Sequence, residues 1–171
     1  KSRRLGVSLG INLLPTKLKV CSFDCIYCEC GWTDLSDETK SVLPSRKEIR
    51  DGLKRRLQEL QTSGPAPDAI TFAGNGEPTL HPEFSGIVDD VARLRDQHFP
   101  SAKISVLSNA TRVHKEAIFN ALQKADNNIL KLDAGTDEMF QRINNPAAGL
   151  SLSSIVEGLL KFKGNLIIQT L

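Results

Sequence analysis

Apolar and polar positions along this chain follow two different periods. Over residues 6–14 apolar side chains alternate with small or polar ones, which is the period of a half-buried β-strand. From residue 45 onward leucines and isoleucines recur every three or four positions, which is the period of an amphipathic helix. Ser45 and Glu48 have the spacing of a capping box at its start, and Gly64 with Pro65 ends it. This part of the chain therefore predicts a strand, a loop and a helix.

The same alternation continues to the end of the chain. The predicted strands are 69–73, 103–108, 129–133 and 166–171, and the predicted helices are 84–94, 118–125, 136–143 and one that begins near Ser154, with Glu157 completing a second capping box. Strands that alternate with helices pair in parallel through right-handed crossovers. The predicted fold class is therefore α/β, best as a partial (β/α) barrel, with a doubly wound open sheet as the alternative. In both folds ligands bind at the C-terminal ends of the strands.

Composition narrows the class of protein. The 171 residues are 40% hydrophobic and 25% charged, which is ordinary for one soluble globular domain. A net charge of +2, from 22 basic and 20 acidic side chains, is too even to predict a polyanion partner. The chain begins at Lys1, with neither a secretory signal nor an apolar run of membrane-spanning length. We expect a trimmed cytoplasmic protein with no membrane partner.

All four cysteines lie within ten residues, which favours a metal site over a disulfide framework. Cys21, Cys25 and Cys28 can wrap three corners of a [4Fe-4S] cluster and leave one iron open to a substrate or cofactor. The alternative is a zinc knuckle with Cys30 as the fourth ligand. Tetrahedral zinc sites usually split their ligands into two separated pairs, whereas these cysteines form a single group, so we favour the cluster.

A loop rich in glycine follows the predicted strand 69–73. Gly74 and Gly76 permit positive φ and a close approach of backbone, and Pro78 removes an N–H donor. Such a loop can present bare carbonyl groups to an ammonium group. Alone this loop is typical of an ordinary turn. Because it follows the strand that comes next after the cysteines, the cysteine motif and the glycine-rich loop support each other as parts of one site.

Polar residues also end the next two strands. Ser108 and Asn109 end the strand 103–108, and the period of two in 129–133 places Lys131 and Asp133 opposite its two leucines. The leucines belong under the helices, so we expect the charged pair to face the barrel interior. Charges there are costly unless they meet a ligand or each other, and both interpretations stay open.

The cysteine spacing, with Tyr27 just before the third cysteine and the 74–78 loop on the next strand, resembles the signature of the radical S-adenosylmethionine (SAM) superfamily. Further segments resemble one subgroup, the Fe-S oxidoreductases related to the tRNA wybutosine-synthesis radical SAM enzyme: 9–15, 28–32, 76–82, 132–134 and 143–146. The wybutosine enzyme carries further cysteines for a second cluster, and this chain has only Cys30 to spare. Two-cluster chemistry on tRNA is therefore not implied.

The resemblance implies cofactors and site residues. Cys21, Cys25 and Cys28 would bind one [4Fe-4S] cluster, with Cys30 either a bystander or a neighbouring thiol that tunes the cluster through hydrogen bonding. The residues implied to contact SAM are Tyr27, Gly74, Asn75, Gly76, Glu77, Pro78, Ser108, Asn109, Lys131 and Asp133. The 74–78 loop would receive the methionine ammonium group, and the residues at the strand ends would contact the ribose and carboxylate. Asn75 departs from the commonest form of this motif. No catalytic residue is assigned, and His81 is the one histidine expected near the site.

The implied function is an oxidoreductase that cleaves SAM reductively to a 5′-deoxyadenosyl radical, which abstracts hydrogen from an unidentified substrate, either a tRNA base or a small molecule. The implied electron donor is of the flavodoxin or ferredoxin type, and residues 1–171 would be the N-terminal part of the radical SAM core domain, without its later strands. One alternative is an activating enzyme that installs a glycyl radical in a partner protein. Another is a zinc-bearing RNA-binding module, which the basic residues of the first predicted helix favour. Those residues are also typical of a solvated helix face.

Overall fold

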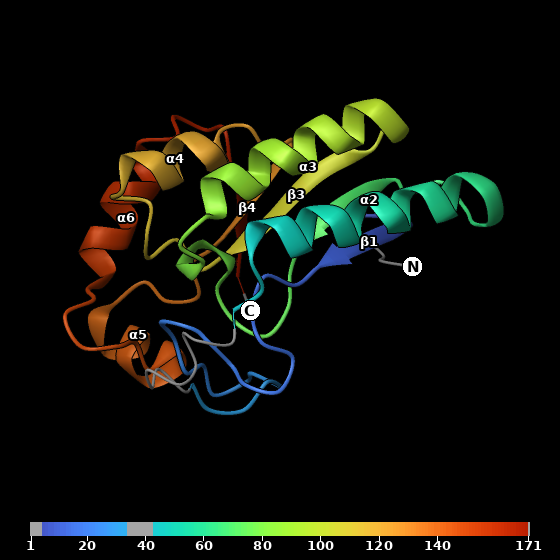
Figure 1. The fold of residues 1–171 in the computed structure, drawn as a ribbon. Helices are drawn as coiled ribbons and strands as arrows, with labels where there is room; N and C mark the ends of the chain where they lie inside the picture. Colours follow the sequence, from blue (N-terminus) through green and yellow to red (C-terminus); the bar gives the residue numbers. More distant parts are fainter. Residues whose placement is uncertain (1–4, 34–42, 171) are drawn as a thin grey trace.

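The computed structural model describes residues 5–33 and 43–170, shown in Figure 1. The strands are β1 (Ser8–Ile11), β2 (Ala69–Phe72), β3 (Lys103–Ser108), β4 (Asn127–Lys131) and β5 (Ile167–Gln169). The helices are α2 (Arg46–Ser63), α3 (Phe84–His98), α4 (Glu116–Leu122), α5 (Asp137–Asn144) and α6 (Leu152–Leu160), with a short 3-10 helix η1 (Pro78–Leu80). None of the helices in this described part is long and apolar enough to cross a membrane.

The five strands form one parallel sheet in the order β1-β2-β3-β4-β5. Each strand thus lies beside its sequence neighbour, whereas a doubly wound sheet reverses its strand order part-way. This is the order of a (β/α) barrel, and within the described residues the sheet is open, with β1 and β5 at its edges. The predicted partial barrel is confirmed, and the doubly wound alternative is wrong.

The two faces of the sheet differ in polarity. On one face α2, α3 and α4 lie side by side (Figure 1), and Phe72 of β2 packs edge-on against Phe84 of α3, with ring centroids 5.8 Å apart. Because side chains alternate along a strand, the residue before Phe72 points to the other face. There Thr71 shares a hydrogen bond of 2.7 Å with Ser8 of β1. The helices therefore cover an apolar face, and a more polar face lies toward the barrel interior.

Element boundaries follow local hydrogen bonds. The capping box at the start of α2 is confirmed, with the Ser45 hydroxyl and the Glu48 carboxylate each accepting a bond from the other residue's backbone N–H. The second predicted capping box is wrong, because α6 begins at Leu152 and Ser151 is its N-cap, accepting from Ser154 N at 3.3 Å. The earlier start buries Leu152 in the core. The fourth strand is 127–131 instead of 129–133, and the first covers only 8–11 of the predicted 6–14.

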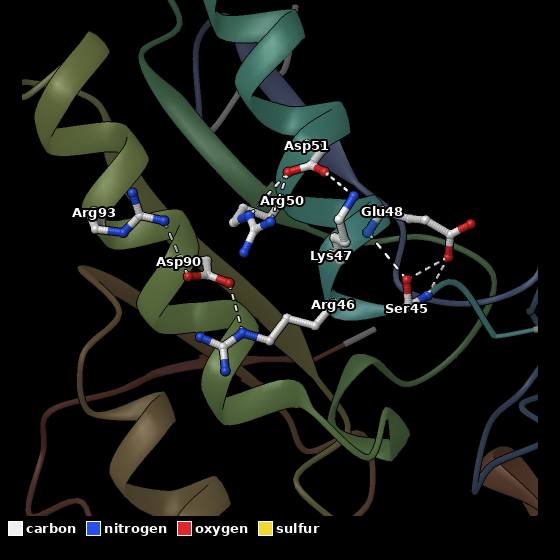
Figure 2. A network of polar contacts seen from close by, with 8 residues as sticks. All are labelled: Ser45, Arg46, Lys47, Glu48, Arg50, Asp51, Asp90 and Arg93. Carbon is white, nitrogen blue, oxygen red and sulfur yellow. Dashed lines mark hydrogen bonds and ion pairs between the residues drawn. The ribbon is translucent and has the colours of Figure 1, made fainter.

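Three basic residues at the start of α2, Arg46, Lys47 and Arg50, have acidic neighbours, which Figure 2 shows from close by. Arg46 contacts Asp90 of α3 at 2.7 Å, which joins the start of α2 to its neighbouring helix. On α2 itself, Lys47 and Arg50 both contact Asp51, at 3.0 and 3.1 Å. These contacts favour the solvated helix face over the interpretation as an RNA surface.

Candidate cofactor site

A cavity of about 240 Å³ lies at the C-terminal ends of the central strands. Ten of the thirteen predicted site residues line it: Cys21, Cys25, Tyr27, Cys28, Gly74, Gly76, Glu77, Ser108, Asn109 and Lys131. The other three, Asn75, Pro78 and Asp133, lie outside its lining. The fold thus brings the cysteine loop, the glycine loop and two strand ends to one place.

The cysteine loop pairs with the glycine loop on one side. Val20 N donates to Asn75 O at 3.0 Å, and Val20 O accepts from Glu77 N at 2.9 Å. Gly76 has φ of 135°, and a Cβ atom there would lie 1.9 Å from Val20 O. Glycine is therefore required at this position because another backbone segment approaches it closely.

On its other side the cysteine loop completes a helix end, and the two segments lie together in Figure 1. The last carbonyl groups of a helix have no partner within the helix. Asp24 N donates to Asn144 O at 2.9 Å, and Ile26 N donates to Ile143 O at 3.0 Å, both at the C-terminus of α5. The loop N–H groups thus satisfy carbonyls of α5, which fixes the cysteine segment against that helix.

Lys19 and Asp24 form an ion pair within the cysteine loop. Lys19 is 3% exposed and lines the cavity, and its Nζ contacts Asp24 Oδ1 at 2.9 Å and Gly31 O at 3.1 Å. Burial is the largest influence and opposes the charge of Lys19, but the hydrogen bond to Asp24 and the nearby charges together outweigh it, and the pKa of Lys19 is raised. Thr33 also donates to Asp24, from its N at 2.8 Å and its Oγ1 at 2.7 Å. The pair therefore joins the two ends of the loop that carries the cysteines.

Glu77 is buried, and its carboxylate binds donors of the protein itself. Oε1 accepts from Thr79 N at 3.0 Å and from Ser108 Oγ at 2.8 Å, and Oε2 accepts from Asn109 N at 2.6 Å. Burial raises the pKa of Glu77, and these hydrogen bonds oppose that rise. The carboxylate thus holds the ends of β2 and β3 in register at the cavity.

Asn75 and Asn109 have different orientations. Asn75 Nδ2 donates to Thr16 O at 2.8 Å and so braces the segment before the cysteines. Asn109 Nδ2 donates to Ser22 Oγ at 2.9 Å and lies 3.6 Å from Cys21 Sγ. Asn109 therefore contacts the cysteine loop directly.

Asp133 is the centre of a buried network behind the cavity. Its side chain is fully buried, and it accepts from the Tyr27 hydroxyl, from Asn144 Nδ2 at 2.8 Å and from Lys131 Nζ at 3.3 Å. Lys131 Nζ also lies 4.8 Å from the centroid of the Tyr27 ring. Burial, and then the hydrogen bond to Asp133, raise the pKa of Tyr27, so the phenol keeps its proton. Lys131 and Asp133 therefore bridge each other, and Lys131 alone of the two lines the cavity.

A protein with this arrangement of cysteines and glycine loop can be assigned to a family from its whole sequence. Residues 17–168 match the family model described as the radical SAM superfamily. The chain belongs to the radical SAM superfamily. Radical SAM proteins are enzymes that use a [4Fe-4S] cluster and SAM, and they need an electron donor. This membership favours the enzyme over the zinc-bearing RNA-binding module.

Relatives and solved structures agree with this radical SAM assignment. A UPF0026 protein from Methanocaldococcus jannaschii is 34% identical over 174 residues, which cover 99% of this chain and 51% of that protein. A structure of anSMEcpe with bound AdoMet has a TM-score of 0.65 at 22% identity, over 95% of this chain and 41% of that chain. Archaeal TYW1 has a TM-score of 0.50 at 15% identity, over 90% and 52%. These structures share the fold, and the chain spans about half the length of the curated UPF0026 relatives it matches.

The residues of this radical SAM chain fit a cluster held by three thiolates. Cys21, Cys25 and Cys28 are half-buried and free, and all line the cavity. Burial, and then the charge of Glu77, raise the pKa of the Cys21 thiol to about 12, so this thiol stays protonated without a metal. Phe23 N donates to Cys21 Sγ at 3.4 Å, as N–H groups do at cluster sulfurs. Cys30 is the most exposed of the four and lines the same cavity, and the described residues contain no group of three His, Cys, Asp or Glu arranged for a single metal ion.

His81 does not line the cavity, so its expected place near the site is wrong. Its ring is buried between loops, with Nε2 at 2.9 Å from Pro44 O and Nδ1 accepting from Glu83 N at 3.1 Å. Both ring nitrogens thus serve the connection between η1 and the helices. Sequence reasoning also missed Lys19 and Gln169, which line the cavity. The signal for Lys19 was a charge between two apolar residues, two positions before Cys21.

Proposed function

We propose that this chain is the cofactor-binding part of a radical SAM oxidoreductase, with Cys21, Cys25 and Cys28 as ligands of one [4Fe-4S] cluster. The cofactors supply the chemistry, in which reductive cleavage of SAM gives a 5′-deoxyadenosyl radical that abstracts hydrogen from the substrate. One observation carries the proposal: the three cysteines, the glycine loop and the ends of β3 and β4 line a single cavity. Polar groups from four separate segments therefore converge where parallel sheets bind ligands.

In this proposal each group of the protein has a distinct task. The thiolates of Cys21, Cys25 and Cys28 would hold the cluster and would leave it one position for SAM. The Gly74 carbonyl already accepts from Gly76 N at 2.9 Å, so its second lone pair is the one available to the SAM ammonium group. Lys131 lines the cavity and supplies a positive charge for the SAM carboxylate.

Other residues hold these groups in place. Glu77 binds protein donors on both oxygens, so we assign it to orienting Ser108 and Asn109. Asn75 braces the segment before the cysteines, and Asp133 orients Tyr27 and Lys131 from behind the cavity. We therefore propose that these three act through their neighbours, without direct contact with SAM.

The substrate and the electron donor are properties of the whole protein, and this chain spans only about half the length of its curated relatives. We propose a flavodoxin or ferredoxin as donor, and a tRNA base or a small molecule as the substrate. The four ion-paired basic residues of α2, Arg46, Lys47, Arg50 and Arg56, give no separate support for RNA.

Anaerobic reconstitution tests the proposal. We expect about four irons and four sulfides per chain, as one cubane requires, and release of 5′-deoxyadenosine when both SAM and a reductant are added. Omitting either SAM or the reductant is the matched control and should abolish the product. Stoichiometric zinc without sulfide after anoxic purification would contradict the proposal.

A further inference from the structure

One buried side-chain amide contacts both a cluster cysteine and the Asp133 carboxylate. Asn144 is the last residue of α5 and is 2% exposed. Its Nδ2 atom donates to Cys25 Sγ at 3.4 Å and to Asp133 Oδ2 at 2.8 Å. An amide nitrogen carries two hydrogens, so both are used by these two acceptors.

The main chain of the same residue is also engaged. Asn144 O accepts from Asp24 N at 2.9 Å, next to Cys25 in the sequence. A substitution of the Asn144 side chain leaves this backbone bond in place. The side chain and the docking of the cysteine loop can therefore be separated by experiment.

The Asn144 amide and the Asp133 carboxylate have opposite effects on the reduction potential of a cluster. An N–H donor at a thiolate sulfur stabilises the reduced cluster, which carries one more negative charge, and so raises the reduction potential. A buried carboxylate nearby has the reverse effect, because its negative charge opposes the incoming electron. Asn144 supplies the donor to Cys25 and also neutralises part of the Asp133 charge, as do Tyr27 and Lys131.

We propose that Asn144 is a positioning residue that sets the reduction potential of the cluster by donating to Cys25 and by holding Asp133. This inference rests on the proposed cluster at Cys21, Cys25 and Cys28. Asn109 has a comparable position at a second thiol, with Nδ2 at 3.6 Å from Cys21 Sγ. Two side-chain amides, one from the end of α5 and one just after β3, thus approach two of the three ligating sulfurs.

The test compares midpoint potentials of reconstituted variants, read from the electron paramagnetic resonance signal of the reduced cluster during an anaerobic redox titration. Asn144→Ala should retain its iron and sulfide but shift the potential to more negative values. Asp133→Asn removes the charge on the other side of the same hydrogen bond, and it should shift the potential to less negative values. Opposite signs from two neighbouring residues would not arise from general damage to the site.

A matched control is Asn128 of β4, a buried amide whose Nδ2 and Oδ1 have no hydrogen-bond partner within the described residues. Asn128→Ala should leave the potential unchanged. If Asn144→Ala does not fold, Asn144→Leu, which also lacks the donor but is closer to asparagine in size, takes its place in the same comparison. A full cluster with the wild-type potential in Asn144→Ala, or in Asp133→Asn, would overturn the inference. If the unmodified chain binds no cluster, it is the proposed function that fails.

Discussion

Ion pairs at the cysteine loop and on the helix-covered side of the molecule differ in how far they are exposed to solvent. At the loop, Lys19 and Asp24 form an ion pair in which the Lys19 side chain is 2% exposed. Between α2 and α3, the Arg46 side chain of the pair with Asp90 is 40% exposed (Figure 2). Both pairs have a short N···O contact, at 2.9 and 2.7 Å. The environment, and not the distance, should decide what each pair contributes.

The physical reason is desolvation. A buried polar group that loses its partner has no water to replace it, whereas an exposed group is solvated again. The loops around the cavity should therefore tolerate few changes, and the surface of α2 should tolerate many.

The largest effect is expected at the cysteines. Cys21→Ser, Cys25→Ser and Cys28→Ser should each lose nearly all of the iron and sulfide, because each removes one of only three thiolate ligands. Cys30→Ser should retain about four irons, since Cys30 is the exposed cysteine of the four. Iron and sulfide analysis after reconstitution checks both. An equal loss in all four variants would mean that Cys30 is a ligand as well.

The next effect concerns folding stability at Glu77. Glu77→Ala should lower the free energy of unfolding by about 3 kcal/mol, because the buried donors of Thr79, Ser108 and Asn109 lose their acceptor. Urea denaturation of the metal-free chain measures the change. The matched control is the exposed Glu157, where Glu157→Ala should alter stability by less than about 0.5 kcal/mol. Equal losses in the two variants would refute the role given to burial.

The sequence predicted those features of the two regions that depend on residues close together in the chain. Local sequence patterns predicted the five strands and the five α-helices of the described residues, though not the 3-10 helix η1, and the capping box of α2 needed only Ser45 and Glu48, three residues apart. Most of the cavity lining also followed, because the C-terminal ends of parallel strands lie at one edge of the sheet. These features depend on local pattern or on topology alone.

The sequence could not predict partners that come together only in the folded chain. Asn144 contacts Cys25 across 119 positions, and nothing local distinguishes it from Asn145. Asn75 and His81 were assigned near the cofactor by sequence position, but their side chains contact distant backbone oxygens. Lys19 is buried because the loop folds back on itself, which brings Asp24 and, twelve residues away, Gly31 into contact with the Lys19 ammonium group. Such contacts are set by how loops dock, which periodicity does not encode.

A smaller effect is expected for the pair between α2 and α3. Asp90→Asn should lower the free energy of unfolding by about 1 kcal/mol near neutral pH, and by less in high salt. The hydrogen bond from Arg46 is the main cause that lowers the pKa of Asp90. A lowered pKa means that the stabilisation is present above the unfolded-state pKa and is lost as the pH falls through the folded-state pKa.

Urea denaturation of Asp90→Asn and the unmodified chain, at neutral pH and again in acid, checks this dependence. The difference between the two proteins should shrink in acid, where the carboxyl is protonated and the pair no longer exists. A difference that stays constant with pH would show that packing of Asp90 against its neighbours, and not its charge, contributes the stability.

The smallest effect is expected for Lys47, which contacts Asp51 one helical turn away on the solvated side of α2 (Figure 2). The Lys47 side chain is 78% exposed, so water solvates the ammonium group almost equally well with and without its partner. Alanine also has the higher helix propensity, which offsets the lost pair. Lys47→Ala should therefore leave the thermal midpoint unchanged in low salt and in high salt. A loss as large as that of Asp90→Asn, abolished by salt, would show that exposed pairs on α2 matter as much as half-buried ones and would remove the contrast between the two regions.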